Sequence, residues 1–148
     1  MIVRAVTGDA FEVETMGLSF AEVPHKYRRN WRKVPFEDGV RWVSRLQSRL
    51  GGWDAKNPKT KLIKAVFNHV AGRLGKAKHD LRVLNCVGTC LDCRGYDCIF
   101  VCNGVTVTVD LTISGSKPTN ADVLLTRRHF LNNEHYRVAD EIARRLLA

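Results

Sequence analysis

The stretch GYDCIFVCNGVTVTVDLT, residues 95–112, contains two short apolar runs that meet at Asn103-Gly104. An Asn-Gly pair between such runs is typical of a two-residue β-hairpin turn, because both turn positions need a positive φ. Pairing outward from this turn places Asp97 opposite Asp110, in a non-hydrogen-bonded pair where side chains approach closely. Two facing carboxylates repel each other, so we expect a divalent cation to compensate their charge. The alternative is a half-solvated edge hairpin whose two Asp point into water.

The alternation of residue types along this hairpin also predicts its orientation, because successive strand side chains point to opposite faces. One face is wholly apolar and is expected to be core; its members are Cys98, Phe100, Cys102, Val105, Val107, Val109 and Leu111. A register slip of one residue would turn all of these side chains to the wrong face, so the pattern itself specifies the register.

The composition predicts one globular domain over residues 1–148, since 45% of the residues are hydrophobic and 26% are charged. No stretch reaches the apolar length of a membrane span, and the N-terminus lacks the apolar centre of a signal peptide. We therefore expect a cytoplasmic protein that does not enter membranes. Five cysteines, an odd number, fit reduced thiols better than a closed disulfide framework.

Positive charge is concentrated in one part of the chain. The formal net charge is +9, and residues 24–82 hold 16 Lys and Arg against 4 Asp and Glu. Such a segment favours a polyanionic partner. The segment 24–36, PHKYRRNWRKVPF, interleaves Tyr27 and Trp31 with basic residues and predicts a nucleic-acid contact loop. Its basic residues are Lys26, Arg28, Arg29, Arg32 and Lys33. A solvated basic loop whose aromatic rings pack into the core is the alternative.

Periodicity predicts the remaining elements. A helix over 38–50 places Arg41, Arg45 and Arg49 on one face as a cationic ridge, which would extend the basic surface. A second helix is expected to begin at Asn57-Pro58 and to stop at Gly75. The other expected elements are strands over 2–6, 11–15, 81–87 and 123–130 and a helix from residue 134.

The cysteines are spaced Cys86-x3-Cys90-x2-Cys93-x4-Cys98-x3-Cys102. Cys90 and Cys93 have a zinc-like interval, but the second comparable pair that a zinc site needs is missing. We therefore expect ordinary thiols and no Zn²⁺. A zinc-stabilised interaction domain built on Cys86, Cys90 and Cys93 with one further ligand is kept as a third hypothesis.

The order of these elements resembles the PD-(D/E)XK nuclease-like superfamily, with the closest likeness to the archaeal Holliday-junction resolvase type. The likeness rests on a helix (59–74), a strand (81–87), a Gly-rich turn, Asp97, an apolar run, the Asn-Gly turn and a strand that ends in Asp110-Leu111-Thr112. It implies an α/β (α+β) fold with a restriction-endonuclease-like core: a central mixed β-sheet with a β-hairpin over 96–113, flanked by helices. The nuclease-like core would span about 59–148 and a basic N-terminal extension about 1–58.

The resemblance also implies a site. Asp97 and Asp110 match the two metal-binding acids, which would hold Mg²⁺ or Mn²⁺ through oxygen ligands. Thr112 stands where the superfamily has its catalytic lysine, and Lys117 in the following loop is the candidate for a migrated lysine. The superfamily's extra glutamate has no counterpart on the 59–74 helix, and Glu37 would serve only if the fold brought it close.

The expected function is therefore nucleic-acid binding, with DNA favoured over RNA, and Mg²⁺-dependent endonucleolytic hydrolysis of phosphodiesters. Resolvase-like relatives act as dimers, so a homodimer is part of this expectation. The rival hypothesis is a non-catalytic DNA- or RNA-binding module, either an inactive nuclease fold or an unrelated basic α+β domain. The threonine at position 112 favours this rival.

Overall fold

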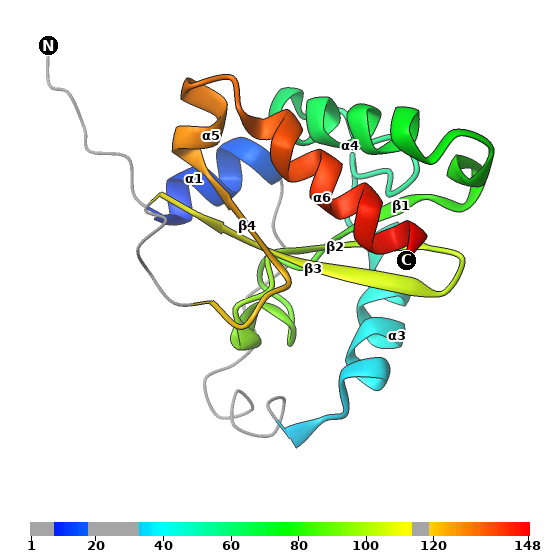
Figure 1. The fold of residues 1–148 in the computed structure, drawn as a ribbon. Helices are drawn as coiled ribbons and strands as arrows, with labels where there is room; N and C mark the ends of the chain where they lie inside the picture. The colour runs from blue at the N-terminus through cyan, green and yellow to red at the C-terminus, as the bar shows by residue number, and fades with distance from the viewer. Residues whose placement is uncertain (1–7, 18–32, 114–118) are drawn as a thin grey trace, which may run out of the picture.

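The computed structural model describes residues 8–17, 33–113 and 119–148, which form an α+β fold with a four-stranded mixed sheet (Figure 1). The strands are β1 (Arg82–Asn85), β2 (Cys98–Cys102), β3 (Val105–Thr112) and β4 (Val123–Thr126), in that order across the sheet. The helices are α1 (Gly8–Met16), α3 (Phe36–Leu46), α4 (Lys61–Leu74), α5 (Arg127–Leu131) and α6 (His135–Leu147). Short 3₁₀ turns are η2 (Gln47–Arg49), η3 (Gly75–Asp80) and η4 (Asp92–Arg94).

The hairpin predicted from the Asn-Gly turn is confirmed. Asn103 and Gly104 have φ values of 51° and 79°, as a two-residue turn of this kind requires. The β2–β3 ladder is antiparallel and runs from Cys102 opposite Val105 to Cys98 opposite Val109, the predicted register. β1 is also antiparallel to β2, whereas β4 lies parallel to β3.

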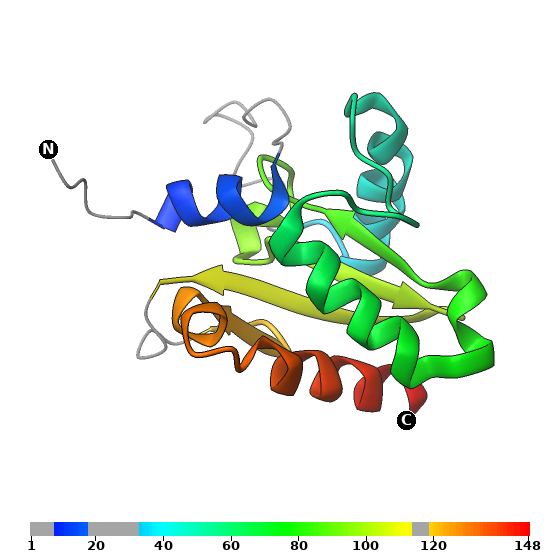
Figure 2. The ribbon, with the colours of Figure 1, turned by 90° about the horizontal axis from the view of Figure 1, so that it is seen from above.

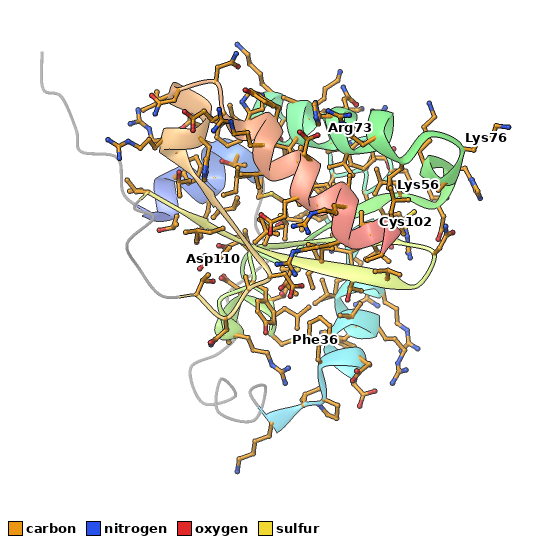
Figure 3. All side chains as sticks on the ribbon, viewed as in Figure 1. Phe36, Lys56, Arg73, Lys76, Cys102 and Asp110 are labelled. Atoms are coloured by element: carbon orange, nitrogen blue, oxygen red, sulfur yellow. The ribbon has the colours of Figure 1, made fainter. Side chains whose placement is uncertain are left out.

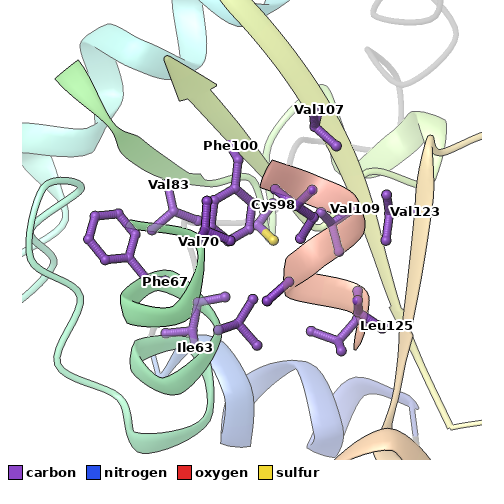
Figure 4. Close-up of a cluster of buried hydrophobic side chains, with 14 of the residues drawn as sticks. Ile63, Phe67, Val70, Val83, Cys98, Phe100, Val107, Val109, Val123 and Leu125 are labelled. Carbon is purple, nitrogen blue, oxygen red and sulfur yellow. The ribbon is translucent and has the colours of Figure 1, made fainter. Parts of the chain in front are cut away.

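The main core lies on the sheet face that the alternation pattern predicts. Helices α1, α4 and α6 contact one another or the sheet on this face (Figure 2). Phe67 of α4 stacks on Phe100 of β2 with ring centroids 6.5 Å apart, and Val70 and Leu125 close the same cluster (Figure 4). Phe11 and Met16 of α1 belong to this core and are fully buried. Helix α1 therefore contributes to the same core as the 59–148 region.

The opposite face of the sheet carries a smaller core. Val43 of α3 packs there with Ile99 and with the connection that follows β1. Gly39 of α3 lies so close to this connection that a Cβ there would be 2.9 Å from Cδ2 of Leu91. β2 is thus covered on both faces, which explains why all five of its residues are buried.

Several predicted boundaries are wrong. The predicted strand over 11–15 is part of helix α1, because Phe11, Thr15 and Met16 are all fully buried and their spacing fits one helical face. The predicted strand over 2–6 lies outside the described residues. Helix α4 begins at Lys61 rather than after Asn57. The backbone N–H of Asn57 instead donates to the carbonyl of Asp54 (3.1 Å) and closes a turn.

Two further elements are shorter than predicted. The helix expected over 38–50 is α-helical only to Leu46 and continues as the 3₁₀ turn η2. The strand expected over 123–130 ends at Thr126, because the side chains of Thr126 and His129 form a capping box that starts α5. Over the described part of the chain, no helix is both long and apolar enough to span a membrane.

Candidate functional site

Asp97 lies immediately before β2 and is the most deeply buried acidic side chain in the described part of the chain, with 2% of its surface exposed. Its backbone N–H donates to the carbonyl of Val109 (2.9 Å), and the ladder also pairs Cys98 with Val109. Two residues thus oppose one, which is the arrangement of a β-bulge. Asp97 therefore does not pair directly with Asp110 as predicted. A carboxylate oxygen of Asp97 instead accepts the N–H of Leu111 (2.8 Å).

Three carboxylates from distant parts of the sequence meet at this position. Glu12 of α1, Asp92 of η4 and Asp97 each offer one ligand atom, and these atoms all lie within 4.8 Å of one another. Asp92 is held in place because one of its carboxylate oxygens accepts the N–H of Gly88 (2.9 Å). We call Glu12, Asp92 and Asp97 the carboxylate group.

The electrostatics of the carboxylate group are unfavourable without a cation or a proton. Burial is the largest cause that raises the pKa of Asp97 far above its ordinary value, and the charge of Glu12 is the next. Asp92 and a hydrogen bond with Asp110 act in the same direction, whereas the N–H of Leu111 opposes them. A buried carboxyl in such surroundings either keeps its proton or is neutralised by a bound cation.

The ligand chemistry of the carboxylate group suits a hard cation. Carboxylate oxygens favour Mg²⁺, Mn²⁺ or Ca²⁺ over the softer metals that thiolates select. Among the described residues, no other set of three His, Cys, Asp or Glu ligand atoms comes equally close. The cysteines proposed for zinc do not form such a set, and burial raises the pKa of Cys86 and Cys90. Both thiols are therefore protonated in the metal-free protein at neutral pH.

Two of the residues predicted from the sequence lie at or beside the carboxylate group. Asp97 is in the carboxylate group, and Asp110, half-buried on β3, adjoins it through the hydrogen bond with Asp97; its position is visible in Figure 3. Thr112 lies two residues further along β3 and pairs with Thr126 of β4. Lys117 lies outside the described residues.

Two members of the carboxylate group were not predicted. Glu12 was assigned to a strand, although the helical spacing of its apolar neighbours would have placed it on a helix. Asp92 lies between Cys90 and Cys93, where the sequence pattern indicates no role for it. Glu37, the alternative acid, is exposed on α3 and is not part of the carboxylate group.

The predicted basic surface is described only in part. Lys26, Arg28, Arg29 and Arg32 lie outside the described residues. Lys33, Arg41, Arg45 and Arg49 are exposed. Arg41 pairs with Asp38 on the same helix, and α3 also presents Trp42, which is 43% exposed. An aromatic ring among arginines is the composition expected of a nucleic-acid contact surface.

Comparisons of the chain with protein-family models, with curated proteins and with solved structures find no match.

Proposed function

We propose that this protein binds nucleic acid and hydrolyses phosphodiester bonds, as a PD-(D/E)XK-like, Mg²⁺- or Mn²⁺-dependent endonuclease acting on DNA. The proposal is supported by acids at the start of β2 and the end of β3, the adjoining strands on which the superfamily carries its metal-binding acids. The concentration of Lys and Arg in residues 24–82 supports a polyanionic substrate.

The observation that carries the proposal is the burial of Asp97 within the carboxylate group. An exposed acidic cluster is common and needs no ligand, but Asp97 is 2% exposed and has two further carboxylates within 4.8 Å. Such an arrangement destabilises the fold unless something offsets it, so a cation ligand role explains why these residues meet.

In this mechanism Glu12, Asp92 and Asp97 would hold the metal ion, with Asp110 beside them. When bound, the ion would supply Lewis-acid polarisation of a phosphoryl oxygen and would lower the pKa of a coordinated water. The backbone N–H groups of Gly88 and Leu111 orient two of the carboxylates. The arginines of α3 would hold the nucleic-acid backbone through its phosphates.

The test measures Mn²⁺ binding by titration calorimetry and nuclease activity on the same samples. Asp97→Asn and Glu12→Gln are expected to lose saturable binding and cleavage together. Asp38→Asn and Glu141→Gln are matched controls, because they make the same chemical changes in exposed ion pairs on α3 and α6. Binding and cleavage that survive in Asp97→Asn after repurification would refute the proposal.

The second candidate is a non-catalytic nucleic-acid-binding module, and the observation that favours it is the uncharged Thr112 at the lysine position. This alternative predicts oligonucleotide binding with a steep dependence on salt and no response to Mg²⁺ or to EDTA. Saturable Mn²⁺ binding without any cleavage would support an inactive nuclease fold.

A further inference from the structure

A pocket of about 610 Å³ lies where β3 and β4 end. Its lining residues are Ile113, Leu124, Thr126, Arg127, Arg128, His129 and Leu131. We call it the exit pocket. None of its residues belongs to the carboxylate group.

The strand register relates the exit pocket to the proposed site. In the parallel β3–β4 pair, Asp110 lies beside Leu124 and Thr112 lies beside Thr126. Paired residues on neighbouring strands project from the same face of a sheet, so the two pocket residues share the face of Asp110. In both ribbon views, the end of β3 lies at the same end of the sheet as α1 and α5 (Figure 1, Figure 2). The exit pocket therefore begins one strand away from Asp110.

The polar groups of the exit pocket are mainly donors. Arg127 is half-buried and Arg128 is exposed, and within the described ranges neither guanidinium forms an ion pair. By contrast, Arg73 and Arg145 are both paired with carboxylates. Unpaired guanidinium groups that line a pocket suit a phosphate, whose oxygens match their planar fork of N–H donors.

His129 adds a further donor in a defined orientation. Its Nδ1 accepts the backbone N–H of Thr126 (2.9 Å), so a neutral ring must carry its proton on Nε2. Burial lowers the pKa of His129, which favours this neutral form at neutral pH. The Nε2–H group is then available as a donor beside the two arginines.

Position 112 gives the exit pocket a role in the proposed chemistry. Thr112 is uncharged, so charge that develops on a phosphate beside Asp110 needs a cation from another element. Arg127 directly follows Thr126, the residue paired with Thr112. Arg127 is therefore the first residue after β4, at the end of the sheet where Thr112 lies.

We propose that the exit pocket binds a phosphodiester group of the nucleic acid next to the carboxylate group, and that Arg127 supplies the positive charge that Thr112 lacks. This inference rests on the proposed function for its catalytic part. The phosphate recognition itself uses Arg127, Arg128 and His129 and does not need the metal ion.

The test measures binding of a fluorescent DNA oligonucleotide by anisotropy in EDTA, over a range of salt concentrations. Arg127→Gln is expected to weaken binding about tenfold and to reduce the slope of log affinity against log salt by about 1. Arg144→Gln is the matched control, because Arg144 is an exposed arginine of α6 outside the exit pocket. Mn²⁺ binding should be the same in all three proteins.

The outcomes separate this inference from the proposed function. Arg127→Gln that binds and cleaves DNA like Arg144→Gln would overturn the inference even if the metal site is real. If wild type neither binds Mn²⁺ nor cleaves DNA, but still binds DNA more tightly than Arg127→Gln does, the result would support the phosphate pocket and refute the nuclease. Inorganic phosphate that binds in an Arg127-dependent manner while DNA binding is unchanged would identify a free-anion site and overturn the inference.

Discussion

The side-chain amide of Gln47 is hydrogen-bonded to both backbone groups of Asn85. Its Nε2 donates to the carbonyl of Asn85 (2.9 Å), and its Oε1 accepts the N–H of Asn85 (2.8 Å). Among the described strands β1 lies at the edge of the sheet, so no described strand pairs with its outer peptide groups. Gln47 therefore takes the place of a strand residue there, while the carbonyl of Ala55 accepts the N–H of Val83 (2.8 Å). These bonds fix α3 and η2 to the sheet.

Gln47→Ala is expected to lower the free energy of unfolding by about 2 kcal/mol or more, because it removes the side chain that hydrogen-bonds both the N–H and the carbonyl of buried Asn85. Urea denaturation followed by circular dichroism would measure the loss. Ser48→Ala is the control, since Ser48 is the exposed neighbour on the same 3₁₀ turn. Equal stability of the two variants would show that water or another group satisfies Asn85.

Asp97→Asn is expected to stabilise the protein in EDTA at neutral pH. Because the pKa of Asp97 is raised by folding, the folded state holds a proton that the unfolded state releases above about pH 4. The stability of wild type relative to Asp97→Asn should therefore fall as pH rises, by up to about 1.4 kcal/mol per pH unit.

The same pair of proteins gives the opposite result with metal. If the carboxylate group holds a metal as proposed, Mn²⁺ would bind only the folded wild type, so it should raise the melting temperature of wild type and leave that of Asp97→Asn unchanged. Thermal denaturation with and without Mn²⁺ measures both effects. A stability difference that is flat between about pH 5 and pH 8 in EDTA would contradict the prediction.

Thr112→Lys is expected to restore activity to an Arg127→Gln protein. Arg127→Gln should lower kcat by about 100-fold, the effect expected when a group that stabilises the transition state is lost. A lysine at position 112 would return a cation to the end of β3 and recover part of kcat. Thr106→Lys is the control, because Thr106 is half-buried on the same face of β3 but lies near the hairpin turn. Equal recovery of kcat by Thr112→Lys and Thr106→Lys would refute the role of Arg127 as the cation that compensates for Thr112.

Gly104→Ala is expected to lower the free energy of unfolding by about 1 kcal/mol, because its φ of 79° disfavours any side chain. A Cβ at this position would meet no atom within 4 Å, so the loss would come from the backbone alone. Gly51→Ala is the matched control, since Gly51 also has open space and has no positive φ. Urea denaturation should rank Gly104→Ala below Gly51→Ala and wild type.

The hairpin was predictable because its determinants are local. The Asn103-Gly104 turn and the strict alternation of apolar residues together specify the turn, the register and the buried face. Of the acids at the candidate site, the sequence pattern singles out only Asp97 and Asp110, which lie on the hairpin. The bulge at Asp97 could not be predicted, because no residue type in that segment signals it.

Glu12 and Asp92 could not be predicted as partners of Asp97 for a different reason. Their proximity depends on how α1 packs on α4 and β3 and on how the connection after β1 folds back. Both are tertiary relationships between residues far apart in the chain, which local periodicity does not encode. The Val and Thr residues of segment 11–15 suggested a strand, and packing of Phe11 and Met16 in the core overrides that preference.

The unequal burial of the five thiols makes the protein suitable for selective chemical labelling. Cys93 alone is not buried, and burial raises the pKa of Cys86, Cys90, Cys98 and Cys102. A maleimide dye should therefore react first at Cys93, without any engineered residue. Because Cys93 is adjacent to Asp92, a dye there would lie close enough to report paramagnetic quenching by Mn²⁺ at the carboxylate group. The native chain thus carries its own attachment point for a distance-sensitive optical probe.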